Sequence, residues 1–104
     1  MKLAFGPFEL DELAHTLTMR GDLQPVQPRV FELLAYLLKN AGRVVPKDEL
    51  MDVLWPNVIV TESSLQRAAS LARRALAAGG LADALRNIAR YGYRLAIDDA
   101  QLGS

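Results

Sequence analysis

Short alternations of apolar and polar residues dominate residues 2–26 of the chain. A two-residue period is that of strands with one buried face, and the Gly-Pro and Gly-Asp pairs between the alternations are typical of turns. The pattern therefore predicts a meander of three or four antiparallel strands. The apolar positions of these strands are Leu3, Phe5, Phe8, Leu10, Leu17, Met19, Leu23 and Val26.

From Pro28 onward the apolar residues follow the three- and four-residue spacing of amphipathic helices. The first helix is predicted to begin at Pro28, where a missing N–H does no harm, and to end at residues 40–42. Residues 43–45 predict a short extended piece. A second helix is then expected to begin at Pro46 and to stop at the Trp-Pro pair of residues 55–56. Its expected inner positions are Leu50, Val53 and Leu54.

A third helix is expected to follow the N-cap residue Thr61 and to run to about Ala78, before two glycines. Its inner face carries Leu65, Ala69, Ala72 and Leu76, whereas polar and basic side chains fall largely on the other side. Residues 86–97 predict two short strands with a turn near Tyr91-Gly92. We expect Tyr93 to lie in the core.

The order of strands, three helices and a hairpin predicts an α+β winged helix-turn-helix fold. We expect one domain over residues 1–97. It comprises an N-terminal antiparallel sheet (residues 1–27), three helices (residues 28–78) and a C-terminal β-hairpin wing (residues 79–97). Residues 98–104 are expected to form a flexible tail.

Composition narrows the class of protein. A chain of 104 residues fits one domain, and the absence of cysteine excludes disulfides and cysteine-based zinc sites. The sequence has no apolar run near the roughly 20 residues that span a bilayer, and acidic residues follow the N-terminus too soon for a signal peptide. We therefore expect a cytoplasmic protein.

Charge is unevenly distributed although the net charge is zero. Residues 1–62 carry six basic and nine acidic side chains, whereas residues 63–97 carry six arginines and the single acid Asp83. This segregation favours a one-sided basic surface of the kind that binds nucleic acid, although charge also segregates by chance in short chains.

The ordered motifs resemble the OmpR/PhoB-type DNA-binding output domains of bacterial response regulators. The resemblance covers residues 3–97. Within this family, the chain is similar to the variant found at the N-terminus of regulators in which no receiver domain precedes the DNA-binding domain. The motifs that carry it are Phe5-Gly6, Phe8-Glu9-Leu10-Asp11, Phe31-Glu32-Leu33-Leu34, Gly42-Arg43-Val44-Val45, Leu54-Trp55, Leu71-Ala72-Arg73-Arg74-Ala75-Leu76 and Gly92-Tyr93-Arg94-Leu95.

The resemblance implies sequence-specific binding of double-stranded DNA in transcription regulation. Residues 61–78 would be the recognition helix in the major groove, and the wing near Arg90 would lie in the minor groove. Arg86 and Arg94 lie near the wing. A local ion pair that holds the strand would explain Arg94 as well as a contact with DNA would. The candidate DNA-binding residues are Trp55, Ser63, Ser64, Gln66, Arg67, Ser70, Arg73, Arg74 and Arg90.

Some assignments have an alternative. Trp55 would donate its indole N–H to a phosphate or simply pack between helices. Residues 56–60 correspond to a segment that touches RNA polymerase in some relatives, and their apolar character indicates a partner surface or one buried valine. A homodimer on repeated half-sites is a further partner implied by the family. Ala68, Leu71 and Ala89 depart from positions that are often polar or basic in relatives.

The residues leave two other functions to compare with DNA binding. An enzyme is disfavoured, because the sole histidine, His15, falls on a predicted strand as a surface residue and the sequence has no phosphate-binding glycine loop and no metal-ligand spacing. No cofactor is expected. The stronger rival is a winged-helix module that binds protein and not DNA, which zero net charge, Leu71 and the apolar loop favour.

Overall fold

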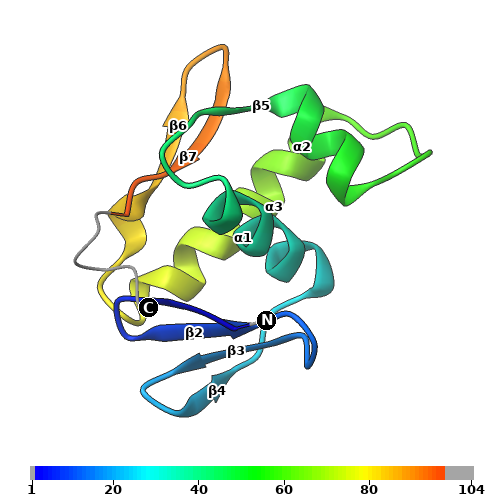
Figure 1. The fold of residues 1–104 in the computed structure, drawn as a ribbon. Helices are drawn as coiled ribbons and strands as arrows, with labels where there is room; N and C mark the ends of the chain where they lie inside the picture. The colour runs from blue at the N-terminus through cyan, green and yellow to red at the C-terminus, as the bar shows by residue number, and fades with distance from the viewer. Residues whose placement is uncertain (1, 98–104) are drawn as a thin grey trace.

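Four short strands form the N-terminal sheet, in the order β1-β2-β3-β4 with every pair antiparallel (Figure 1). The structure is a computed structural model that describes residues 2–97; the predicted tail, residues 98–104, lies outside the described residues. The predicted meander is confirmed with four strands. Its elements are β1 (Lys2–Phe5), β2 (Phe8–Asp11), β3 (Thr16–Met19) and β4 (Asp22–Gln24).

Three details of the sheet differ from the prediction. His15 lies in the turn between β2 and β3 with φ 54°, and not on a strand, although it is exposed as expected. Leu23 is 63% exposed, because β4 is an edge strand of three residues that reaches beyond the core. Val26 follows the end of β4 and packs on the edge of the core from the linker to α1.

The three helices are α1 (Pro28–Lys39), α2 (Lys47–Leu54) and α3 (Glu62–Ala77). The prediction for α1 is confirmed at both ends, and all four inner positions expected for α3 are buried. For α2 the prediction was wrong by one residue at its start, because Pro46 is the N-cap in an extended conformation. Val53 is 38% exposed, so only Leu50 and Leu54 form the buried face of this two-turn helix.

A second sheet joins the wing to the start of α2. β5 (Val45–Pro46) pairs with β7 (Gly92–Leu95), which pairs in turn with β6 (Leu85–Ile88); the 3-10 turn η1 (Ala82–Ala84) precedes β6. The sequence predicted the hairpin and an extended segment before α2, but not their pairing, since β5 has only two residues. The hairpin turn comprises residues 89–91, with Arg90 at φ 70°.

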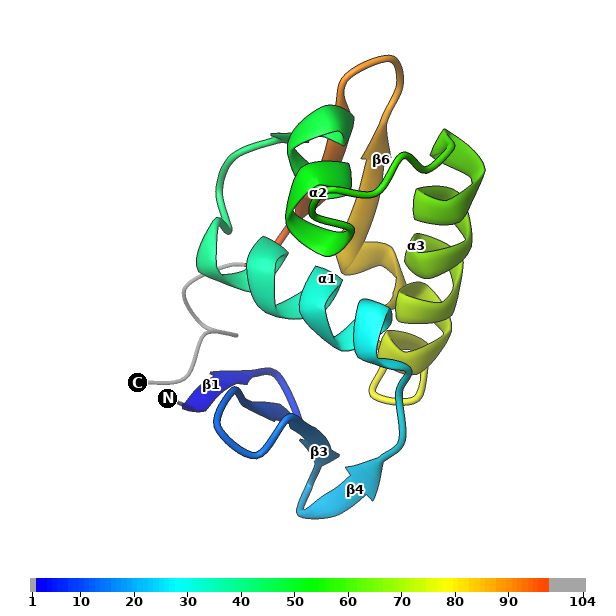
Figure 2. The ribbon, with the colours of Figure 1, turned by 90° about the vertical axis from the view of Figure 1, so that its right-hand side faces the viewer.

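Both sheets and all three helices share one core. Phe5, Phe8 and Leu10 enter it from the N-terminal sheet, and Tyr93 and Leu95 enter it from the wing, as predicted for Tyr93. Figures 1 and 2 show the resulting order in space: the N-terminal sheet lies at one end of the molecule, and α2 and the wing tip lie at the other. Among residues 2–97, no helix has the length and apolar character needed to cross a membrane.

Candidate nucleic-acid interface

The outer face of α3 is polar over most of its length. Its inner residues recur at three- and four-residue spacing, so the side chains between them point to solvent. Ala68 is buried with the inner face and Leu71 packs partly on the core, which explains why these two positions are apolar. The predicted residues that α3 leaves exposed are Ser63, Gln66, Arg67, Ser70 and Arg74, while Ser64 is half-buried.

The first turn of α3 carries a small hydroxyl cluster. Thr61 is the N-cap in extended conformation, as predicted, but its side chain makes no capping bond to the helix. Its Oγ1 lies 2.7 Å from Ser63 Oγ instead. The N–H groups of this turn are therefore not capped by Thr61, and such groups favour an anion.

Arg73 is held differently from the other predicted arginines. Its Nε and one terminal nitrogen donate to the carbonyl oxygen of Leu85, at 3.3 and 3.0 Å. Leu85 is the first residue of β6, so this side chain joins α3 to the base of the wing. Arg73 thus has a structural role in the free protein, which the sequence had not indicated.

The wing presents arginines at its tip and on its outer side. Arg90 is exposed in the turn, beside the exposed ring of Tyr91. Arg86 and Arg94 are directly opposite each other on β6 and β7, and both are exposed. Within residues 2–97 Arg94 forms no ion pair, so the local pairing considered for it is not found there.

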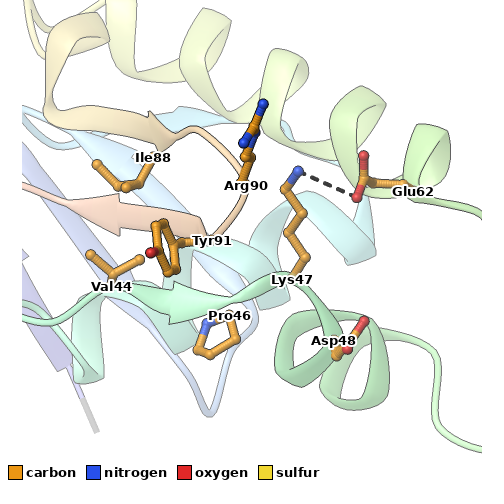
Figure 3. A pocket seen from close by; sticks show the side chains of 8 residues that line it. All are labelled: Val44, Pro46, Lys47, Asp48, Glu62, Ile88, Arg90 and Tyr91. Carbon is orange, nitrogen blue, oxygen red and sulfur yellow. Dashed lines mark ion pairs between the residues drawn. The ribbon is translucent and has the colours of Figure 1, made fainter.

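An open hollow of about 760 Å³ separates the wing tip from the first residues of α2 and α3 (Figure 3). Lys47 and Glu62 form an ion pair across it, with Nζ 3.3 Å from Oε1. Arg90 enters the same hollow from the wing. Lys47 was not among the residues predicted from the sequence; the signal that could have found it is a basic side chain on the first residue of a helix, at its N-terminus.

Buried Tyr93 lies within reach of this charged group. Burial raises the pKa of its hydroxyl, and the carboxylate of Glu62 raises it further, while the positive charges of Lys47 and Arg73 lower it. The tyrosine therefore stays neutral and contributes a polar group beneath a surface where both signs of charge meet.

Trp55 and the loop after it form the far side of the helix-turn-helix. Trp55 is the C-cap of α2 and packs partly against the core, which agrees with the packing alternative and leaves part of the residue exposed. In the loop, Val58 and Ile59 are exposed, Ile59 fully (102%), whereas Val60 is half-buried. One half-buried valine does not account for the two exposed apolar side chains.

A comparison with known proteins identifies the family. Residues 22–95 match the family model described as "Transcriptional regulatory protein, C terminal". The chain belongs to this family. Its members are OmpR/PhoB-type winged-helix domains of transcription regulators, so the predicted family and fold are confirmed.

Curated relatives extend the similarity along the chain. The chain is 30% identical to the phosphate regulon transcriptional regulatory protein PhoB of Rhizobium meliloti over 94 residues, which are 89% of this chain and 41% of that protein. It is 36% identical over 53 residues to the sensory transduction protein RegX3 of Mycobacterium tuberculosis, over 51% of this chain and 23% of that protein. The chain thus spans less than half the length of these relatives.

Solved structures share the fold at low sequence identity. The DNA-binding domain of Escherichia coli CadC superposes with a TM-score of 0.82 at 23% identity, covering 93% of this chain and 92% of that one. The RstA DNA-binding domain of Klebsiella pneumoniae, solved in complex with the RstA box, gives a TM-score of 0.75 at 21% identity, covering 91% and 96%. Both confirm the winged-helix fold.

Proposed function

We propose that this domain binds double-stranded DNA in bacterial transcription regulation, with α3 in the major groove and the wing near Arg90 at the minor groove. The observation that carries the proposal is the polar outer face of α3, where Gln66, Arg67 and Ser70 are exposed on a helix whose other face is buried. A helix of this kind fits the major groove, where each base pair presents its own donors and acceptors. The complex of the RstA domain with DNA supports the same use of the fold.

Each predicted residue has a role within this proposal. Gln66 and Arg67 are on the exposed face in the first half of α3 and would contact base edges. Ser63, Ser64, Ser70 and Arg74 would bond phosphates or bases, and the exposed part of Trp55 would offer its indole N–H to a phosphate. Arg73 would contact DNA only with donors that Leu85 leaves free.

The alternative of a domain that binds protein alone fits fewer observations. It draws on zero net charge and on the exposed apolar residues Val58 and Ile59. These residues are confined to the loop between α2 and α3, and a DNA-binding domain with an additional protein partner accounts for them equally well. Arg73 is explained in part by its bonds to Leu85, but the exposed arginines of α3 and the wing form no ion pair among residues 2–97 and are not explained by protein binding alone.

Salt dependence of binding tests the proposal. The purified domain is titrated into a fluorescent duplex of generic sequence, and anisotropy is followed at several salt concentrations. With about four to six phosphate contacts, log affinity should fall against log salt with a slope of roughly −4 to −5. Absence of binding at the lowest salt would favour the protein-binding alternative.

Two arginine variants define the binding face. Arg90→Ala and Arg73→Ala should each weaken binding, by roughly three- to tenfold for the loss of one phosphate contact at low salt. Arg29 is an exposed residue at the start of α1, so Arg29→Ala is the matched control and should bind DNA like the unmodified domain. Urea denaturation of each variant separates lost contacts from lost structure, which matters most for Arg73. Unchanged affinity in both variants would refute the proposed face.

We further propose that two copies of the domain bind repeated half-sites as a homodimer.

We also propose that the loop of residues 56–60 contacts RNA polymerase. Ile59→Asn should leave folding stability within about 0.5 kcal/mol of the original and DNA affinity unchanged, because the side chain is fully exposed. Binding of purified RNA polymerase to the domain–DNA complex should decrease. Equal polymerase binding by the Ile59→Asn variant and the unmodified domain would count against this partner.

A regulator acting on chromosomal DNA works in the cytoplasm, which is the compartment we propose.

A further inference from the structure

The ion pair between Lys47 and Glu62 joins the first residues of the two helices of the helix-turn-helix. The side chain of Lys47 is only 20% exposed, so most of its length is covered by neighbouring residues. The backbone N–H of the same residue donates to the carbonyl of Tyr91, at 3.1 Å, which fixes its position against the wing. Lys47 is therefore a positive charge held at a defined place.

Glu62 has an unusual position for a DNA-binding surface. It is the sole acidic residue of α3, and its side chain is half exposed at the end of the helix nearest the wing tip (Figure 3). A carboxylate there is favoured by the helix dipole, but it repels a phosphate that approaches the same N–H groups. Its charge also cancels that of Lys47, its partner at 3.3 Å.

Lys47 and Arg90 line the same hollow and lie on the same side of the molecule as the start of α3. Two cations that line the same open hollow can both attract one backbone phosphate. Phosphate contacts of this kind hold a protein in register on the duplex. In the free protein this phosphate position is neutralised in part by the carboxylate of Glu62.

We propose that Glu62 masks a phosphate-binding position formed by Lys47 and Arg90, so that DNA must displace the carboxylate to gain this contact. The inference rests on the proposed DNA-binding function and deepens it. Displacing the carboxylate costs the ion pair, which lowers affinity for every duplex. The freed carboxylate then attracts a cation from the salt, which offsets part of the counterion release from the DNA and makes the salt dependence shallower.

The test is a double-mutant cycle measured by anisotropy on a generic duplex at several salt concentrations. Glu62→Gln keeps the size of the side chain and should raise affinity at low salt by roughly three- to tenfold, with a slope steeper by about 0.5 to 1. Lys47→Gln should lower affinity. In the Lys47→Gln background, Glu62→Gln should change affinity less than about twofold, since the masked cation is gone.

Glu9→Gln is the matched control. It also removes one negative charge and one ion pair, to Lys2 at 3.7 Å, but on the N-terminal sheet at the opposite end of the molecule. It should leave affinity nearly unchanged, and urea midpoints should show that all variants are folded. Equal gains from Glu9→Gln and Glu62→Gln would reduce the effect to net charge and overturn the masking.

Other outcomes distinguish masking by Glu62 from DNA binding by the domain. A gain from Glu62→Gln that persists in the Lys47→Gln background would mean that the carboxylate repels DNA directly, which also overturns masking of Lys47. Salt-dependent binding by the unmodified domain with no effect of Glu62→Gln would refute this inference and leave DNA binding intact. No binding by any variant at low salt would refute both.

Discussion

Gly92 is the residue at which the wing and the start of α2 approach each other most closely. It opposes Pro46 in the pairing of β7 with β5. A Cβ at this position would lie 2.7 Å from the carbonyl carbon of Val45 and 2.9 Å from Cα of Pro46, and closer still to the carbonyl oxygen of Val45. Since these are backbone atoms, no side-chain rotation relieves the overlap.

We predict that Gly92→Ala destabilises the domain by about 2–4 kcal/mol, because the two strands must separate to admit the methyl group. Gly21→Ala is the control: its Cβ would meet nothing within 4 Å, but its φ of 89° disfavours alanine. That strain alone should cost about 1–2 kcal/mol. Urea denaturation measures both, and equal losses would show that close packing at Gly92 is unimportant.

Individual residues were predicted best where the core decides their position. Leu65, Ala69, Ala72 and Leu76 of α3 are all buried as expected, because a 16-residue helix repeats its period often enough to define a face. Val53 was assigned to the wrong face because α2 has only two turns. The polar contacts of Arg73 and Lys47 reach residues 12 or more positions away in the chain, which periodicity does not report.

Helices α1 and α2 are joined by a polar cluster around Glu49. Its carboxylate accepts a hydrogen bond from the hydroxyl of Tyr36 on α1 and from the guanidinium of Arg43, at 2.6 Å, in the connection between the helices. Arg43 also donates to the side-chain oxygen of Asn40, at 3.1 Å. This cluster therefore fixes the orientation of α2, and with it the start of the helix-turn-helix.

The cluster predicts how stability depends on pH. The Arg43 guanidinium and then the Tyr36 hydroxyl lower the pKa of Glu49 below its ordinary value of 4.5. The same carboxylate raises the pKa of Tyr36. Because folding lowers the pKa of Glu49, this residue stabilises the fold above pH 4.5, and the contribution is lost as the pH falls through the lowered pKa.

Glu49→Gln should therefore lower the urea midpoint near neutral pH, and its difference from the unmodified domain should shrink as the pH falls below about 4. Glu32→Gln, which loses a more peripheral pair with Arg29 at 3.3 Å, is the control for removing an acid and should show a smaller difference at neutral pH. A difference for Glu49→Gln that is constant from acid to neutral pH would contradict the role of its charge.

At the scale of elements, the sequence predicted nearly every strand and helix and their order. Local signals sufficed for this, since Pro28, Thr61 and the glycines mark element ends. The pairing of β5 with β7 could not be predicted, because two residues carry no period and the paired residues Val45 and Tyr93 are 48 positions apart. The candidate DNA-binding face was predicted mainly from the residue pattern of α3, whereas the hollow beside it depends on the pairing of β5 with β7.

The whole molecule has a single core that includes the N-terminal sheet. The family model matches from residue 22, after β3, yet Phe5, Phe8, Leu10 and Leu17 of β1–β3 are among the most deeply buried side chains. Gly79, just after α3, packs against this sheet so closely that a Cβ would meet the ring of Phe8 at 2.5 Å. The sheet is therefore part of the same domain as the winged helix.

We predict that a chain beginning at Asp22 does not fold cooperatively. Burial of the four apolar side chains in β1–β3 contributes about 6–12 kcal/mol, which is comparable with the total stability of a small domain. Thermal unfolding followed by circular dichroism measures this, with a chain of residues 1–97 as the control that should melt like the full sequence. A cooperative transition in the shortened chain would show that the family segment folds alone.

The β5–β7 pairing has a consequence for the thermodynamics of association. Because α2, α3 and the wing are tied together by backbone hydrogen bonds and by Arg73, their geometry is set before any duplex arrives. Little conformational entropy then remains to be lost on binding. The heat-capacity change of complex formation should accordingly reflect buried surface alone, without the added signature of a segment that folds on its target.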